Sequence, residues 1–207
     1  MEMRRTGTLL AAIVSGLCLA AALGCGGKTT YNVPEVRTFD PPQAKVGASI
    51  VITGSYFDGV SAVSFGGEPA PSYQVNGSGR IVATLPANAR TGDIVVQNPA
   101  GVGSSSFYNQ RPFIVTPVVD SIDPVSGPAG TVVPLTGSGF SGAFGVAIGT
   151  DGTGSSKVTG NDPNHATVVV GGSATTGPVV LTVVDAVSSL TPIYTVSDPG
   201  PVFTVIP

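Results

Sequence analysis

The chain reads Ile50-Val-Ile-Thr-Gly-Ser-Tyr-Phe57 in its first half and Val133-Pro-Leu-Thr-Gly-Ser-Gly-Phe140, 83 positions later, in its second half. Both stretches end a 22-residue segment, 36–57, that aligns with 119–140 without a gap. Eight residues recur unchanged: Val36, Asp40, Pro41, Gly47, Thr53, Gly54, Ser55 and Phe57 return as Val119, Asp123, Pro124, Gly130, Thr136, Gly137, Ser138 and Phe140. Such internal repetition predicts two copies of one structural module.

The segments between glycines and prolines have the pattern of β-strands. The 29 glycines and 18 prolines separate short runs rich in Val, Ile and Thr. Alternation places Ile50 and Ile52 on the inner face of a strand, and Val133 and Leu135 take their places in the second copy. We therefore predict an all-β fold, with strands in the first copy at 36–39, 49–53, 62–65, 71–75, 80–85, 93–97, 104–108 and 113–115.

The second copy differs from the first in two ways. Equivalent residues of the two copies lie 83 positions apart in the repeated segment, whereas Phe113 and its equivalent Phe203 lie 90 positions apart. The second copy therefore carries seven additional residues. We expect most of them within 149–165, a polar stretch with turn residues. Pro134 interrupts a predicted strand, which indicates a sheet edge or a bulge because proline donates no backbone hydrogen bond.

The N-terminus has the pattern of an export signal. Arg4 and Arg5 precede an uncharged apolar run, 8–23, and small residues follow it. Ala22-Leu-Gly-Cys25 then resembles a bacterial lipobox, in which cleavage leaves a lipidated cysteine as the first residue. We therefore expect a signal peptide at 1–24, lipidated Cys25 with a tether at 25–33, and an outer-membrane protein, since Gly26 replaces the aspartate typical of inner-membrane retention.

The cysteine count and the charge narrow the function. Cys18 would leave with the signal peptide, so no disulfide can form in the mature chain. Without Glu2, Arg4 and Arg5 the chain has 7 basic and 11 acidic residues. This balance provides no basic face for phosphates, and we expect no nucleic-acid partner.

Two segments carry a family resemblance. The run Ile50–Phe57, followed by Val63-Ser-Phe-Gly-Gly67, resembles the immunoglobulin-like IPT/TIG domain, and the second copy departs from the pattern at Ile148-Gly-Thr150. The resemblance implies two tandem immunoglobulin-like β-sandwiches, at 34–116 and 117–207. This family occurs in surface receptors, transcription factors, bacterial envelope proteins and, as an accessory domain, starch-active enzymes.

The recurring residues have structural explanations. Gly54 and Gly137 fit a bend where a side chain would collide or where φ is positive. Phe57 and Phe140 are expected in the core beneath it. Asp40 and Asp123, each before a proline, can accept hydrogen bonds from turn amides. No acid or base recurs beside these aspartates, so we expect no catalytic role for them.

The remaining candidate sites lie outside the repeats. Asp151, Asp162 and His165 fall in one polar stretch and are candidate metal ligands, although a solvated turn is the preferred interpretation. No Gly-x-Ser-x-Gly elbow accompanies His165. Four tyrosines could together form a platform on which sugar rings stack: Tyr56, Tyr73, Tyr108 and Tyr194. Packing of these tyrosines on the faces of the sandwich is the simpler explanation.

The sequence therefore predicts a non-catalytic lipoprotein of the cell envelope without a cofactor. Its expected role is structural or adhesive, toward an envelope or extracellular protein. Only 116–117 separate the two modules, which is too short for a flexible linker. The alternative is a surface glycan-binding or spacer lipoprotein. The absence of tryptophan weakens this alternative.

Overall fold

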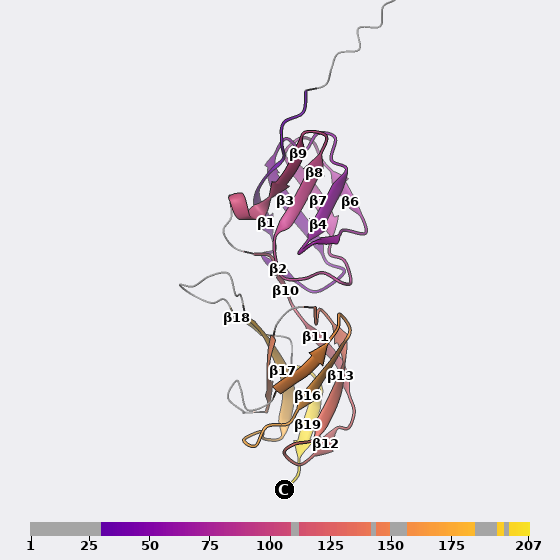
Figure 1. Cartoon of the computed structure of the whole chain (residues 1–207), viewed down its shortest axis with the longest axis vertical. Coiled ribbons are helices and arrows are strands. Elements are labelled where there is room, and N and C mark those ends of the chain that lie inside the picture. The colour runs from indigo at the N-terminus through magenta and orange to yellow at the C-terminus, as the bar shows by residue number, and fades with distance from the viewer. Residues whose placement is uncertain (1–29, 109–111, 142–143, 150–156, 185–193, 197–198) are drawn as a thin grey trace, which may run out of the picture. The chain divides into compact units, whose positions relative to one another are not determined.

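The computed structural model of the chain describes residues 30–108, 112–141, 144–149, 157–184, 194–196 and 199–207. The expected signal peptide at 1–24, Cys25 and Asp151 lie outside these residues. The described residues form two β-sandwich modules, as the repeat predicts (Figure 1). Among them, no helix is long and apolar enough to cross a membrane.

The first module pairs a sheet in the order β1-β3-β7-β6 with a sheet in the order β5-β4-β8-β9, and β2 pairs with β10 in parallel. A short 3-10 helix, η1, follows β9. The elements are β1 (Glu35–Asp40), β2 (Gln43–Ala44), β3 (Ser49–Ser55), β4 (Ala62–Phe65), β5 (Glu68–Pro69), β6 (Tyr73–Val75), β7 (Arg80–Thr84), β8 (Ile94–Asn98), β9 (Gly101–Ser104), η1 (Ser105–Phe107) and β10 (Ile114–Val115).

The second module repeats this topology. One sheet has the order β11-β13-β16-β15, and the other has the order β12-β19-β17-β14 with β18 paired to β17. The strands are β11 (Val118–Ile122), β12 (Ser126–Gly127), β13 (Val132–Ser138), β14 (Phe144–Ile148), β15 (Lys157–Asn161), β16 (His165–Val169), β17 (Gly177–Val184), β18 (Tyr194–Val196) and β19 (Val202–Val205).

Each module has its own hydrophobic core. Ile50 and Ile52 of β3 are fully buried, and Val133 and Leu135 occupy the same places in β13, as the alternation predicts. Phe57 and Phe140 are also fully buried, which confirms their expected core position. A fully buried side chain of this size contributes about 2–3 kcal/mol, so these residues are major contributors to each core.

Gly54 and Gly137 lie inside strands, and the expected bend and positive φ are wrong for both. The predicted collision is the reason for glycine. A Cβ on Gly54 would lie 1.8 Å from the Glu35 carbonyl oxygen and 2.7 Å from Cζ of Phe57. On Gly137 it would lie 2.0 Å from the Val118 carbonyl oxygen and 2.7 Å from Cζ of Phe140.

The partner strand explains this crowding. The pairing of β1 with β3 shifts register between Val36 and Thr38, and that of β11 with β13 shifts between Val119 and Ser121. The shift follows directly after the partner of each glycine, Val36 or Val119. Carbonyl, glycine and phenylalanine ring therefore form one compact arrangement in each module.

The repeated aspartates share a backbone feature. The peptide bonds Asp40–Pro41 and Asp123–Pro124 are both cis. Within the described residues, no turn amide donates to either carboxylate.

Two expectations about strands need correction. The stretch 104–108 is not a strand, because η1 begins at Ser105. Pro134 lies in β13, which has neighbours on both sides, rather than at a sheet edge. Pairing between β11 and β13 stops at Leu135, one residue short of Pro134, whereas β1 pairs as far as Val51, the equivalent residue. The missing proline N–H thus shortens the neighbouring strand instead of moving its own strand to the edge.

The additional residues of the second module are also placed differently from our expectation. Thr53 pairs with Arg80, and its equivalent Thr136 pairs with His165. Arg80 of β7 and His165 of β16 are therefore equivalent, and they lie 85 positions apart. Gln43 pairs with Ile114, and its equivalent Ser126 pairs with Thr204. Ile114 of β10 and Thr204 of β19 are therefore equivalent, and they lie 90 positions apart. Two of the seven residues therefore precede His165, and the other five lie between β17 and β19.

Substituting the strand glycines tests the steric constraint. Gly54→Ala and Gly137→Ala should each destabilise their own module by about 3 kcal/mol, because a Cβ so close to a backbone oxygen forces the strands apart. Differential scanning calorimetry should show the corresponding transition shifted down while the other stays in place. Gly172→Ala is the control, since its Cβ would enter open space. Unchanged unfolding of both variants would contradict this explanation.

Candidate functional site

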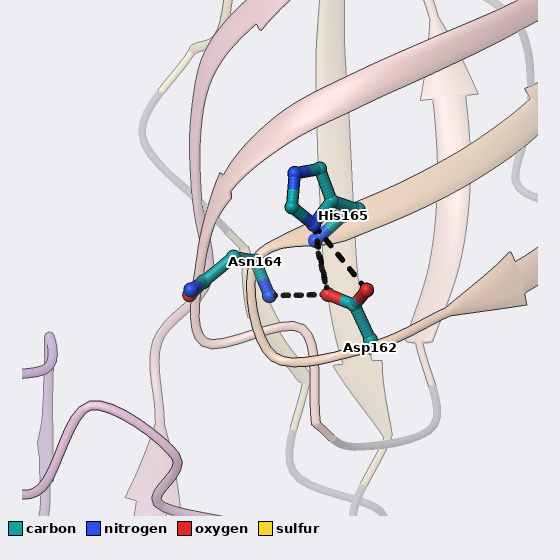
Figure 2. Close-up of polar contacts among 3 residues, drawn as sticks. All are labelled: Asp162, Asn164 and His165. Atoms are coloured by element: carbon teal, nitrogen blue, oxygen red, sulfur yellow. Dashed lines mark hydrogen bonds and ion pairs between the residues drawn. The ribbon is translucent and has the colours of Figure 1, made fainter.

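The two described members of the candidate metal set, Asp162 and His165, close the hairpin between β15 and β16 (Figure 2). Oδ1 of Asp162 accepts hydrogen bonds from the backbone N–H groups of Asn164, at 2.8 Å, and His165, at 2.7 Å. Nδ1 of His165 lies 3.2 Å from Oδ1 and 3.3 Å from Oδ2. The hydrogen bond from Asn164, followed by those from His165, lowers the pKa of Asp162.

This geometry supports the turn rather than the metal site. One carboxylate oxygen is already shared by two backbone donors, and both side chains are exposed. Asp151 lies outside the described residues. Within the described residues, no three His, Cys, Asp or Glu side chains come close enough together to hold a metal ion.

The four tyrosines do not form one platform. Tyr73 packs against the first core and its hydroxyl donates to the Val60 carbonyl at 3.4 Å. Tyr194 lies in β18 of the second module, and its side chain is not described. Tyr56 and Tyr108 are 42% and 54% exposed, and both belong to the first module.

Tyr108 is part of an exposed surface that the sequence did not predict. Here β1 and β9, the edge strands of the two sheets, border a hollow of about 490 Å³. The hollow is lined by Val33, Pro34, Glu35, Val102, Gly103, Phe107 and Tyr108. We call these residues, together with the neighbouring Arg37 and Tyr56, the edge surface. Val33, Val102, Phe107 and Tyr108 are all exposed there, and Phe107 reaches 77%.

Close backbone contact holds the two edges together. A Cβ on Gly103 of β9 would lie 1.9 Å from the Pro34 carbonyl oxygen, so only glycine allows this approach. The chain at Pro34 leads directly into β1. The hollow is therefore fixed by backbone on both sides.

A polar group lies at the rim of the hollow. Nη2 of Arg37 donates to Oε2 of Glu35 at 2.6 Å, and Nε donates to the same oxygen at 3.2 Å. The Arg37 hydrogen bond, and a weaker one from the Tyr108 hydroxyl, lower the pKa of Glu35, while the Glu35 carboxylate raises the pKa of Tyr108. The two formal charges oppose each other, so this part of the surface is polar without a net charge.

Serine side chains determine where η1 begins and thus where Phe107 and Tyr108 lie. Oγ of Ser104 accepts from the Ser106 N–H at 3.3 Å and donates to Oδ2 of Asp93 at 2.8 Å. Ser105 is fully buried, and its Oγ accepts from the Ile94 N–H at 3.0 Å. The Ser105 hydroxyl takes the place of a backbone acceptor opposite β8, which ends β9, and the local bond to Ser104 caps the 3-10 turn.

Asn98, at the end of β8, fixes the backbone beneath the edge surface. Its Nδ2 donates to the carbonyl oxygens of Asn32 at 2.8 Å, Tyr56 at 3.2 Å and Asp58 at 3.3 Å. Its Oδ1 accepts from the N–H groups of Ala100 at 2.9 Å and Gly101 at 3.3 Å. The side chain is only 4% exposed, so one buried amide connects three separate segments.

The second module lacks this connection. Val63 pairs with Val96, and Val146 pairs with Leu181, so the residue equivalent to Asn98 is the buried Val183. This connecting role of Asn98 was not predicted from the sequence. The available signal was an amide ending the apolar run of β8, where the other copy has valine.

Tyr56 has an unusual backbone conformation. Its φ is 61°, and among the described residues no other non-glycine residue has a positive φ. The equivalent residue, 83 positions later, is Gly139 with a φ of 76°. A residue with a Cβ costs about 1–2 kcal/mol in this left-handed region. The first module thus retains a bulky side chain where its copy has glycine.

Replacing Asn98 tests its role as a connector. Asn98→Val should destabilise the first module by about 2–3 kcal/mol, because buried carbonyl groups would lose their donor. Gln97→Val on the same strand is the matched control, since Gln97 is exposed. Thermal unfolding should show a lowered first-module transition for Asn98→Val alone. Equal stability of both variants would refute the connector role.

Comparison with known proteins agrees with this architecture. A family model described as "IPT/TIG domain" matches residues 34–112 and 117–198. No curated protein matches the sequence. Among solved structures, the chain is similar to a surface glycan-binding protein from Prevotella bryantii, at 17% identity and a TM-score of 0.44, covering 80% of this chain and 41% of the other.

Two further structures illustrate the range of similar proteins. An SGBP-B from a xyloglucan utilization locus of Bacteroides uniformis is 15% identical with a TM-score of 0.33, covering 84% of this chain and 50% of the other. A gamma-CGTase from an alkalophilic Bacillus clarkii is 16% identical with a TM-score of 0.34, covering 78% and 23%. This chain spans half or less of the length of each of these three proteins. With both of its modules matched by the family model, the chain belongs to the IPT/TIG domain family.

Proposed function

We propose that the protein is a non-catalytic interaction protein of the cell envelope, which binds its partner through the edge surface of the first module. The exposure of Phe107 beside Tyr108, Val33 and Val102 carries this proposal. Apolar side chains gathered around a hollow mark a binding surface more often than isolated exposed residues do.

The chemistry of the described side chains supports a role without catalysis. His165 contacts an aspartate within its own turn. Ser104 donates to Asp93, which gives a serine–carboxylate pair without a histidine partner among the described residues. Nucleophilic catalysis needs a base positioned at the nucleophile, and this pair serves as the cap of η1 instead.

Two classes of partner fit the edge surface. One is an envelope or extracellular protein, for which exposed tyrosine and arginine side chains are favourable contacts. The other is a glycan, favoured by aromatic rings with polar groups at their rim. The acidic balance of the chain continues to argue against nucleic acid.

Binding to cell envelopes tests the proposal. The labelled full-length protein should bind envelope preparations, and Phe107→Ala should weaken this binding at least about tenfold by removing an exposed apolar contact. Val202→Ala, which alters an exposed valine of the second module, is the matched control. Equal binding by wild type and both variants would remove the edge surface from the function.

Pretreatment of the envelopes separates the two partner classes. Loss of binding after protease treatment indicates a protein, whereas loss after periodate oxidation indicates a glycan. Absence of binding to untreated envelopes contradicts the proposed function as a whole.

We also propose that Cys25 is lipidated and anchors the protein in the outer membrane. The apolar segment before Cys25 and the glycine after it support this location. Several acyl chains on one cysteine give durable attachment, since each buried CH₂ contributes about 0.8 kcal/mol. A tether of about seven residues, 26–32, spans at most roughly 25 Å when extended, which would hold the first module close to the bilayer.

Cys25→Ser should release the protein from the membrane fraction, because the acylated thiol would be absent. Membrane fractionation and mass spectrometry of the N-terminus measure this directly. Cys18→Ser is the control and should leave the anchor intact. A wild-type chain that is soluble and begins with an unmodified residue after Gly24 would show that there is no lipid anchor.

A further inference from the structure

The two modules provide an internal comparison for residue 56. Tyr56 and Gly139 follow the same repeated Thr-Gly-Ser sequence and both have positive φ. In the second module, a Cβ at Gly139 would lie 3.1 Å from Cα of Pro117, so glycine there also avoids crowding. The fold therefore suits glycine at this position, and the tyrosine of the first module opposes that preference.

The surroundings of Tyr56 connect it to the edge surface. The Tyr56 carbonyl and the Asn32 carbonyl accept from the same amide, that of Asn98. Asn32 immediately precedes Val33, which lines the hollow, and Ser55 pairs with Glu35. The Tyr56 backbone is thus connected to the polar rim through Asn98, which the second module replaces with Val183.

The size and the charge of the edge surface indicate the chemistry of its ligand. A hollow of about 490 Å³ is within the range of small-ligand sites. The opposed charges of Glu35 and Arg37 do not favour a strongly charged ligand. Exposed aromatic rings favour a ligand with apolar faces, while the carboxylate, guanidinium and phenol groups favour one with many hydroxyls.

Hydrogen-bonding capacity remains for such a ligand. A carboxylate has about four acceptor positions. Arg37 occupies two of them, both on Oε2 of Glu35. A guanidinium has five N–H donors, of which two are used here. A carbohydrate combines apolar ring faces with hydroxyls that both donate and accept, so it matches this set of groups.

On the basis of the proposed binding function, we propose that the edge surface is a binding site for a neutral carbohydrate chain. Tyr56 is retained in a glycine-like backbone conformation because its side chain contacts this carbohydrate. Phe107 and Tyr108 provide the other aromatic contacts. The Glu35–Arg37 pair hydrogen-bonds the hydroxyls.

The test uses purified full-length protein and a defined panel of probes. The neutral probes are oligosaccharides of glucan, xylan and mannan, and the acidic probes are polygalacturonate and heparin fragments. Isothermal titration calorimetry measures binding, and scanning calorimetry measures the first-module transition. Tyr56→Gly and Tyr56→Asn both accept positive φ, so the asparagine variant tests the site independently of glycine flexibility.

At least one neutral probe should bind, and both Tyr56 variants and Phe107→Ala should weaken that binding tenfold or more. The first-module melting temperature should stay the same or rise in the Tyr56 variants, because the backbone strain is relieved. Val202→Ala should bind as wild type does. This combination of lost binding and kept stability distinguishes a ligand contact from a structural tyrosine.

Other outcomes separate this inference from the proposed function. If both Tyr56 variants bind normally while Phe107→Ala does not, or if they lower the melting temperature, the role of Tyr56 is wrong and the edge surface stands. Binding of acidic probes alone, or of envelope protein with no carbohydrate, overturns the ligand class. If Phe107→Ala changes neither carbohydrate nor envelope binding, both proposals fail.

Discussion

The close approach of backbone to Gly54 and to Gly137 is the constraint on which each module depends. At both places a carbonyl oxygen of the first strand and a phenylalanine ring lie where a side chain would otherwise project. The register shift in the first strand accompanies this approach, and the buried ring occupies the space that a Cβ on the glycine would need. Sheet pairing and core packing are therefore coupled at one residue, which explains why glycine and phenylalanine recur together in the two copies.

The two modules share one scaffold but differ at one end, where the first module carries the edge surface. In the first module the buried amide of Asn98 connects three backbone segments, whereas in the second module Val183 occupies the equivalent position. The first module also accepts backbone strain at Tyr56. Strain of this kind is more common at functional positions than elsewhere, because stability alone would remove it. These two differences mark the end of the first module at which it has diverged from its copy.

The sequence was most informative where the two copies agree. Repetition predicted both modules, and alternation predicted the burial of Ile50 and Ile52. Phe57 was predictable because a large apolar residue recurs after an invariant glycine. The reason for Gly54 was only half predictable, because steric exclusion and positive φ leave the same signature in a sequence.

The candidate site was much less predictable, since it depends on contacts between distant segments. Asn98 bonds to Asn32, 66 positions away, and no local pattern reports such a bond. The end of β9 was misread because Ser105 accepts a hydrogen bond that a strand would make with its backbone. His165 and Asp162 were candidate metal ligands because their residue types suit a metal, although a turn was the preferred interpretation, and in the structure Oδ1 of Asp162 accepts from two backbone N–H groups of that turn.

The bond between Asn98 and Asn32 has a mechanical consequence. Any pull on the N-terminal side of the first module reaches Asn32 before it reaches β1. The Asn98 amide passes part of this load to β8, in the opposite sheet, while the antiparallel bonds between β1 and β3 carry the rest in shear. Tension is thus divided between the two layers of the sandwich, so that neither sheet is peeled away from its edge alone.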